Sequence, residues 1–393
     1  MFTKKNIPAQ PSMNNNRRQP QLSLSVLFWL VAVKDVKGKG GGFIDPLFYS
    51  ACSSSFSAIA QAQQALLIGD ADLCLVGAVH LVHPNQIGHQ PMPGQPLAKS
   101  SNSWPFCSTS DGLIRGSACA IIVLGKPIEA ILRGDPVLGI IKSVAINNDA
   151  GRKPNFMSPS IEGQQAVIER ALEQSGVSRN EIPFWECHAA GTTIGDNIEL
   201  SAIYKAFFKE RTEQEEENNN LFVGSCKANI GHCFAASGIC SIIKLLKMLE
   251  TGLLPPQLLP NNDVMSADLL NPFNGQLIIH SGSESKEILP SKTNAPLYFG
   301  SSNFGIGGTN GAAIIMSGLT NNSLKKAASE WRKDNKKETE INKSLFNKEA
   351  TQYRLFPISA ESKNSLRGFA SKLAEYIKEA RKEFFEIFFE KFF

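Results

Sequence analysis

Short apolar runs alternate with stretches of helical spacing through residues 47–319. Residues 71–77 and 118–124 are almost wholly apolar over lengths that suit buried strands. Residues 163–175 and 239–250 place apolar side chains at the spacing of an amphipathic helix. This alternation predicts an α/β protein in which helices cover a buried sheet.

The same pattern divides the rest of the chain into segments. Residues 1–46 begin rich in Asn, Gln and Pro and contain a glycine-rich run, so they stay unassigned and we expect partial disorder. Residues 320–350 are rich in Lys, Glu and Asn and predict a charged linker. Residues 351–380 predict a short strand followed by an amphipathic helix. Residues 381–393 pair aromatic residues without helical spacing and stay unassigned.

Composition narrows the classes of function. Hydrophobic residues make up 42% of the chain and charged residues 19%, which permits a large core and excludes general disorder. The net charge of +4 comes from scattered basic residues and argues against nucleic acid as the main partner. The eight cysteines include no C-x-x-C pair. They predict reduced thiols of a cytoplasmic protein, with neither a disulfide framework nor a metal site.

Residues 22–33 form an apolar stretch that is too short to cross a membrane, which takes roughly 20 residues. Basic residues precede this stretch, so a signal peptide is one interpretation. A buried strand is the interpretation we favour, because the leader is long and polar and no small-residue cleavage site follows. We expect no membrane span.

Cys52 lies in the sequence Y-S-A-C-S-S-S, directly before residues 56–67, which suit a helix. A thiol at the start of a helix faces unpaired N–H groups that stabilise a thiolate. This position predicts a lowered pKa and a nucleophilic cysteine. On this segment alone, the alternative is a small buried cysteine beside a serine-rich helix cap.

Three further motifs place polar groups on loops that contain glycine. His188 enters a Gly/Thr loop, and Lys227 and His232 lie five positions apart within residues 224–238. Residues 300–311 form a glycine run that can present backbone N–H groups to an anion. Each motif alone also suits a structural role: a core histidine beside a capped helix, a surface lysine with a buried histidine, or a plain glycine-rich loop.

In their order and spacing, these motifs resemble the β-ketoacyl synthase (ketosynthase) domain of polyketide synthases and fatty acid synthases. The nucleophile motif of that family ends in A-C-S-S-S, matched at Cys52. The family motifs E-A-H-G-T-G-T-x-x-G-D-x-x-E, K-x-N-I-G-H and G-F-G-G-T-N are matched at residues 186–199, 227–232 and 305–310. Residues 355–377 resemble the linker that follows ketosynthase domains in modular synthases. The resemblance implies a thiolase-like fold with α-β-α-β-α layers.

The reaction implied by this resemblance is a decarboxylative Claisen condensation in polyketide or fatty acid biosynthesis. An acyl group carried on Cys52 would condense with a malonyl-type thioester on acyl carrier protein, which makes the chain an acyltransferase of the 3-oxoacyl-[acyl-carrier-protein] synthase type. His188 and His232 would donate hydrogen bonds to the malonyl thioester carbonyl and hold the enolate. Lys227 would support both histidines electrostatically, with Glu199 as its expected partner.

The resemblance also implies supporting roles and partners. The backbone N–H groups of Cys52 and Ile306 would form an oxyanion hole. Phe304 and Ile306 would gate the acyl pocket. Thr192 would bind the phosphopantetheine arm of the carrier protein, and Asp196 would support the site from behind. We expect no cofactor or metal on the domain itself. The expected partners are acyl carrier protein, acyl and malonyl thioesters, and a second copy in a homodimer.

Several positions depart from the family pattern. Ala189 and Ala190 stand where the family has Gly-Thr, which removes one hydroxyl contact to the arm. Cys107 replaces an aspartate, and Ile306 replaces the phenylalanine of the gate. The two residues before Ala51 are Tyr-Ser instead of Asp-Thr. None of these changes removes a catalytic group.

Only 51 residues precede Cys52, whereas the family places most of a first βα half there. We therefore expect an incomplete first half, exposed apolar surface, and a chain that as written is not a competent condensing enzyme. A catalytically inactive ketosynthase fragment with a structural or interaction role is the alternative function. A Cys-His hydrolase fits poorly, because two histidines and a lysine suit polarisation of a carbonyl better than a protease triad.

Overall fold

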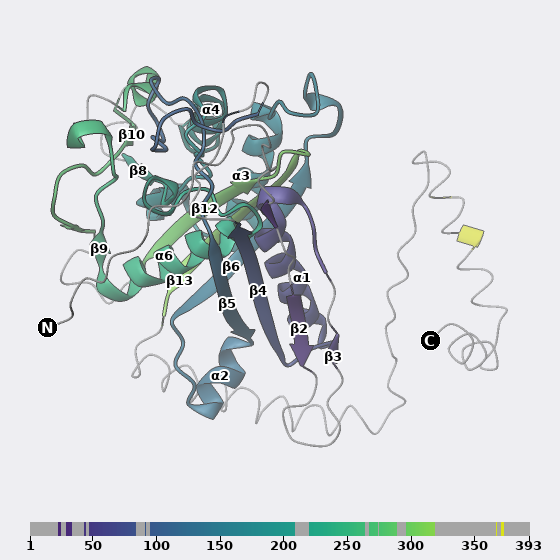
Figure 1. Cartoon of the computed structure of the whole chain (residues 1–393). Helices are drawn as coiled ribbons and strands as arrows, with labels where there is room; N and C mark the ends of the chain where they lie inside the picture. The colour runs from purple at the N-terminus through teal and green to yellow at the C-terminus, as the bar shows by residue number, and fades with distance from the viewer. Residues whose placement is uncertain are drawn as a thin grey trace, which may run out of the picture. The chain divides into compact units, whose positions relative to one another are not determined.

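Two sheets lie on either side of a pair of helices in the computed structural model of the chain (Figure 1). The structure describes residues 47–83, 91, 95–208, 220–263, 267–273, 275–288, 296–318, 367 and 371–372, and the backbone of residues 23–24, 29–33 and 43–44. The chain divides into two compact units, Met1–Ala328 and Ser329–Phe393.

Several predicted segments fall where the structure gives no description. The linker predicted at 320–350, the strand predicted within 351–380 and the tail 381–393 lie outside the described residues. In the second unit, residues 367 and 371–372 are helical, within the stretch for which a helix is predicted. Within the apolar stretch 22–33, the backbone is described for residues 23–24 and 29–33, and both segments are strands.

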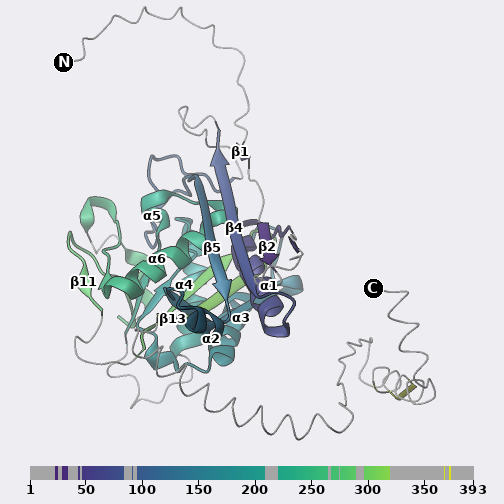
Figure 2. The same cartoon turned by 90° about the horizontal axis from the view of Figure 1, so that it is seen from below.

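The first sheet is centred on β4 (Leu73–Val82), which pairs antiparallel with β5 (Ala118–Gly125). Figure 2 shows these two strands as long neighbouring arrows. The short strands β1 (Ser23–Leu24) and β2 (Trp29–Val33) also pair with β4, and β3 (Phe43–Ile44) pairs with β2. The strands predicted at 71–77 and 118–124 are therefore confirmed.

The second sheet has the order β10-β8-β7-β12-β13-β6 in the described part of the chain. Its strands are β10 (Leu277–Ile278), β8 (Leu221–Gly224), β7 (Phe184–Glu186), β12 (Tyr298–Phe304), β13 (Thr309–Ser317) and β6 (Gly139–Asn148). The first four are mutually parallel, and β13 runs antiparallel to both of its neighbours. A separate ribbon pairs β9 (Leu253–Leu254) with β11 (Lys286–Glu287).

Helices α1 (Ser54–Ile68) and α6 (Ser237–Thr251) form the layer between the sheets, because each contacts strands of both. Helix α3 (Ile161–Ser175) covers the other face of the second sheet, with α4 (Thr193–Phe208) packed against it. The shorter helices α2 (Pro127–Arg133) and α5 (Lys227–Ile230) follow β5 and β8. The predicted layering is confirmed over four successive layers of sheet, helices, sheet and helices.

Local sequence explains where these helices begin and end. The Ser160 hydroxyl accepts a hydrogen bond from the Gly163 N–H at 3.1 Å and caps α3. Glycines in the left-handed region follow the C-termini of α3 and α6, with φ of 65° at Gly176 and 70° at Gly252. The helices predicted at 163–175 and 239–250 are confirmed.

The outer face of β5 carries apolar side chains in contact with solvent. Ile121 and Val123 are 63% and 59% exposed, whereas Ile122 between them faces the helices and is buried. Ile122 packs in one core cluster with residues of α1 and α6. Among the described residues, every helix falls short of the length and hydropathy needed to cross a membrane. In the described part of the chain, α1 and α6 thus cover the face of the first sheet opposite Ile121 and Val123.

Replacing Ile59 tests the importance of the central helix layer. Ile59 of α1 is fully buried, so Ile59→Ala should lower the free energy of unfolding by about 2–5 kcal/mol. Leu67 on the same helix is 76% exposed, so Leu67→Ala should change the free energy of unfolding by no more than about 0.5 kcal/mol. Urea unfolding of both variants measures the difference. Equal losses at both positions would contradict this arrangement.

Candidate active site

Cys52 lies in the 3₁₀ turn Ala51–Ser53, directly before α1. Ala51 has a φ of 54°, a left-handed conformation that costs of order 1–3 kcal/mol in a non-glycine residue. Hydrogen bonds support the turn: the Ser54 hydroxyl accepts from the Ser50 N–H at 2.8 Å and donates to the Ala51 carbonyl at 2.6 Å. The turn buries the Cys52 thiol at the end of the central helix layer.

The fold brings Cys52, His188 and His232 together from three distant segments. His232 Nε2 lies 3.0 Å from Cys52 Sγ, and His232 Nδ1 lies 2.9 Å from the Ser237 hydroxyl. The rings of His188 and His232 meet edge to face with centroids 5.3 Å apart. One ligand atom from each of the three lies within 4.8 Å of the others, so the fold brings these three side chains into one cluster.

Sulfur and imidazole nitrogens are also the donor types of a zinc site. In the described part of the chain, Cys52, His188 and His232 form the cluster of side chains that could hold a metal ion. The charge of Lys227 lowers the pKa of both His188 and His232, so it also disfavours a cation between them. The arrangement suits a neutral or anionic reacting group better than a metal ion.

Burial controls the protonation of the three groups. Burial raises the pKa of the Cys52 thiol to about 11, although Lys227 and the backbone N–H groups of Cys52 and Ile306 lower it. Desolvation lowers the pKa of His188 and of His232 well below the usual value. The prediction of a lowered pKa for Cys52 is therefore wrong. The N–H groups act in the predicted direction, but the loss of water around the thiolate outweighs them.

Glu199 of α4 positions the backbone that carries His188. Its buried carboxylate accepts hydrogen bonds from the N–H groups of His188 at 2.7 Å and Ala189 at 2.6 Å, and from the Ser302 hydroxyl at 2.5 Å. Burial raises the pKa of Glu199 to about 7, while these donors and the charge of Lys227 lower it. Glu199 therefore acts through the peptide chain of the histidine loop.

Lys227, the first residue of α5, is 2% exposed. Its Nζ has no hydrogen-bond partner among the described residues, so the expected pairing with Glu199 is not formed. Its charge still lowers the pKa of Cys52, His188 and His232. Lys227 therefore influences these three groups electrostatically, without the predicted partner.

Asp196 holds the loop that carries Thr192. Its buried carboxylate accepts hydrogen bonds from the N–H groups of Phe106 at 3.1 Å and Thr192 at 3.4 Å. Burial raises the pKa of Asp196 to about 6, against these hydrogen bonds. Thr192 also forms a backbone bridge with Asp111. Asp196 thus joins the histidine loop to the segment that contains Cys107, which is itself buried.

The turn between β12 and β13 brings Ile306 to Cys52. The N–H groups of both residues stabilise the Cys52 thiolate, so both point to where negative charge develops. Lys153 Nζ donates to the carbonyl oxygens of Ile306 at 3.2 Å and Phe156 at 2.7 Å. This ammonium group ties the turn that carries Ile306 to the loop after β6.

The two residues predicted to gate an acyl pocket occupy different environments. Phe304 is buried at the end of β12, and its N–H donates to His188 Nδ1 at 3.4 Å. Its ring lies 5.8 Å from the His188 ring. Ile306 is 38% exposed on the turn that follows. Phe304 therefore contacts His188, whereas Ile306 is partly exposed to solvent.

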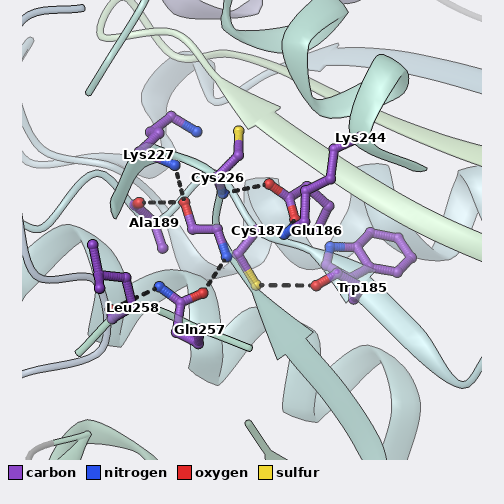
Figure 3. A network of polar contacts seen from close by, with 10 residues as sticks. Trp185, Glu186, Cys187, Ala189, Cys226, Lys227, Lys244, Gln257 and Leu258 are labelled. Atoms are coloured by element: carbon purple, nitrogen blue, oxygen red, sulfur yellow. Dashed lines mark hydrogen bonds and ion pairs between the residues drawn. The ribbon is translucent and has the colours of Figure 1, made fainter. Parts of the chain in front are cut away.

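A network of polar contacts connects the two histidine loops (Figure 3). The Ser225 hydroxyl donates to the Ala189 carbonyl at 2.9 Å, joining the segment after β8 to the segment after β7. Beside it, Glu186 accepts the Cys226 N–H at 2.7 Å and forms an ion pair of 2.5 Å with Lys244 of α6. The network fixes the loops of His188 and Lys227 relative to the central helix layer.

Three residues that shape the site were not predicted from the sequence. Ser237 orients His232, Ser302 donates to Glu199, and Lys153 holds the Ile306 turn. Ser237 and Ser302 lie within the motifs around His232 and the glycine run, as polar residues among small neighbours, and that is a usable signal. Lys153 has no local signal, because its partner lies 153 positions away in the sequence.

Comparison with known proteins places these motifs in a described family. "Beta-ketoacyl synthase, N-terminal domain" matches residues 47–130, and "Beta-ketoacyl synthase, C-terminal domain" matches residues 138–259. A highly reducing polyketide synthase of Neurospora crassa is 33% identical over 70% of this chain. A phenolphthiocerol/phthiocerol polyketide synthase of Mycobacterium tuberculosis is 32% identical over 68%. The chain spans only 11% and 17% of these two relatives.

Solved structures agree with the fold. Ketosynthase twelve of the bacillaene polyketide synthase of Bacillus amyloliquefaciens is 26% identical, with a TM-score of 0.61 over 86% of this chain and 53% of that chain. A ketosynthase domain of oxazolomycin synthesis from Streptomyces albus is 24% identical, with a TM-score of 0.59 over 69% and 46% of the two chains. Both support the predicted thiolase-like fold.

The raised pKa of Cys52 predicts how its alkylation depends on pH. Because the thiolate is the reactive form and burial raises the pKa to about 11, the iodoacetamide rate at Cys52 should keep rising beyond pH 9. Quenched peptide mass spectrometry across pH 6–10.5 separates Cys52 from the other seven cysteines. A plateau below pH 8 would instead show a preformed thiolate–imidazolium pair with His232.

The buried ion pair of Lys244 predicts a loss of stability in Lys244→Met. The variant leaves the fully buried Glu186 carboxylate without its counterion and should lower the free energy of unfolding by about 3–5 kcal/mol. Lys247 on the same helix pairs with Glu250 on the surface, and Lys247→Met should cost no more than about 1 kcal/mol. In urea unfolding, the double variant Glu186→Gln/Lys244→Met should have a higher free energy of unfolding than Lys244→Met alone. No recovery in the double variant would refute the role of the pair.

Proposed function

The chain belongs to the β-ketoacyl synthase family, and on that premise we propose that it forms a ketosynthase domain of a polyketide synthase. The observation that carries this proposal is the convergence of Cys52, His188 and His232 within 4.8 Å beside the charge of Lys227. The proposed reaction is decarboxylative Claisen condensation, an acyl transfer with carbon–carbon bond formation. The acyl and malonyl thioesters would be delivered by acyl carrier protein.

In the first half-reaction, Cys52 would take the acyl group from the carrier thioester. The sulfur attacks the carbonyl carbon, and the developing oxyanion meets the N–H groups of Cys52 and Ile306. The thiol proton passes to His232 Nε2, which lies 3.0 Å away and then returns it to the departing thiol of the arm. The Ser237 hydroxyl can donate to or accept from Nδ1, so His232 can serve as acceptor or donor.

In the second half-reaction, the malonyl thioester would lose carbon dioxide and leave an enolate. His188 Nδ1 accepts the Phe304 N–H, so its remaining hydrogen lies on Nε2 and can be donated to the thioester oxygen. His232 supplies the second donor from the tautomer that carries its hydrogen on Nε2, with the Ser237 hydroxyl donating to Nδ1. The enolate carbon then attacks the acyl carbon on Cys52 and the carbon–sulfur bond breaks. The released Cys52 thiolate takes up one proton from solvent, which balances the carboxylate charge lost with carbon dioxide. The product is a β-ketoacyl thioester on the arm.

Low pKa values for the histidines favour this chemistry. Desolvation keeps both imidazoles neutral at physiological pH, and a neutral ring can donate one hydrogen bond without carrying charge. The charge of Lys227 adds a field that stabilises negative charge nearby. Thr192, half-buried on the loop held by Asp196, is the proposed contact for the phosphopantetheine arm.

Partners and location follow the same proposal. We propose that the domain is part of a multidomain synthase, because the polyketide synthases that it matches are far longer than this chain. A homodimer is proposed from the family resemblance alone. The described cysteines are all free thiols, which supports a cytoplasmic location.

A second candidate is a ketosynthase-like domain with a structural role and no turnover. The exposed apolar side chains of Ile121 and Val123 on β5 favour it, because exposed apolar patches are typical of surfaces that bind another protein. Mass spectrometry of the full chain after incubation with an acyl-carrier thioester separates the two. A Cys52 adduct that is released as β-ketoacyl product on malonyl-carrier addition supports the enzyme. A folded protein with no adduct supports the structural role.

Substituting each histidine tests the proposed division of roles. His188→Ala removes a donor to the enolate oxygen and should slow malonyl decarboxylation by about 100-fold or more, while acyl loading of Cys52 changes little. His232→Ala should slow both steps, because this ring contacts the Cys52 thiol directly. Loading is measured by intact mass and decarboxylation by release of labelled carbon dioxide. Loss of loading with intact decarboxylation in His188→Ala would reverse the assignment.

A further inference from the structure

We propose that Phe234 is a positioning residue for His232, whose imidazole it stacks against so that Nε2 stays directed at Cys52 Sγ. Its effect on catalysis rests on the proposed ketosynthase function, whereas the stacking itself is a property of the fold. Phe234 begins the 3₁₀ turn Phe234–Ala236, two residues after His232 and directly before α6.

The ring geometry carries the proposal. The Phe234 and His232 rings are stacked, with centroids 4.7 Å apart and planes only 18° from parallel. By contrast, His188 meets His232 edge to face at 5.3 Å and 86°. A flat ring against the imidazole face blocks rotation about the Cβ–Cγ bond, which would otherwise swing Nε2 away from the sulfur. The hydrogen bond from Nδ1 to Ser237 then sets the remaining in-plane direction.

The backbone at Phe234 is strained in a way that makes this stacking possible. Side chains two positions apart in a helix point to nearly opposite sides, so regular helix would carry the Phe234 ring away from His232. Phe234 instead has a φ of 43°, in the left-handed region that bulky residues avoid. Such conformations persist where surrounding contacts hold them and are concentrated at functional sites.

Contacts from three other segments hold the Phe234 ring. The ring of His80, fully buried on β4, lies 4.7 Å from the Phe234 ring. Phe234 also packs against the apolar cluster of Leu97, Leu113 and Ala190. Ala190 stands where the family has a threonine, so the position that lost a hydroxyl here supplies an apolar contact to Phe234 instead. The first sheet and the His188 loop therefore both support the ring on His232.

The stack also helps to keep His232 neutral. Desolvation is the largest cause of its lowered pKa, followed by the charges of His188, Lys227 and His80. The Cys52 thiol also faces the ring, and Arg115 lies beside His232 in a backbone bridge. Removing the Phe234 ring would let water reach the imidazole face and weaken the largest of these causes, so the pKa of His232 should rise.

Phe234→Leu in the full-length chain tests the proposal, with Phe234→Tyr as the conservative variant. The side-chain signals of ¹³C-labelled histidine give the pKa of His232 directly, since the chain has only six histidines and each can be assigned by substitution. We expect Phe234→Leu to raise the pKa of His232 by roughly one unit or more. Phe234→Tyr keeps an aromatic ring, so its His232 pKa should equal that of the unsubstituted chain. The acid limb of malonyl decarboxylation should move to higher pH by the same amount, because protonated His232 is inactive.

Leu97→Ala is the matched control, because it opens a cavity in the same apolar cluster without removing a ring from His232. It should lower stability and leave the pKa of His232 unchanged. Should Phe234→Leu fail to fold, Phe234→Met fills the space with a flexible side chain and tests the same ring loss. An unchanged His232 pKa in a folded ring-free variant would overturn the proposal. If no form of the chain decarboxylates malonyl thioester, the proposed function fails, while the histidine titration still decides the stacking.

Discussion

The contact between His232 Nε2 and Cys52 Sγ, 3.0 Å long, is the interaction on which the site depends. Cys52 lies in the turn before α1, and His232 lies shortly before α6. Both helices are packed between the two sheets, so the sheets indirectly set the distance between thiol and imidazole (Figure 1). Strain in the two turns, at Ala51 and Phe234, is supported by this packing.

Burial sets the protonation states of the groups in the site. Removing Cys52, His188 and His232 from water favours their uncharged forms, which suits a site that must stabilise negative charge appearing on a substrate. Lys227 then supplies the positive field from within the fold. Glu199 and Asp196 accept hydrogen bonds from peptide N–H groups, and these bonds hold the backbone of His188, Ala189 and Phe106.

The two sheets contribute unequally to this arrangement. The second sheet is covered by helices on both faces and carries the histidine loops and the Ile306 turn. The first sheet has one covered face in the described part of the chain, yet its strand β4 supplies His80, which supports Phe234. The stability of the first sheet therefore bears on His232 as well as on α1, which links the exposed face of β5 to the chemistry of the site.

The sequence by itself determined the strands near 71–77 and 118–124 and the helices near 163–175 and 239–250. Its motifs also singled out Cys52, His188 and His232, which the fold brings together. Periodic apolar side chains and motifs of small residues are local properties, so they can be recognised without tertiary contacts. Only the tertiary structure decided that Glu199 binds the His188 backbone instead of Lys227, and that burial outweighs the helix at Cys52. Ser302, Lys153 and Phe234 likewise acquire their roles from partners brought close by folding. Desolvation and hydrogen-bond pairing depend on which distant segments cover a group, and periodicity and motif spacing do not carry that information.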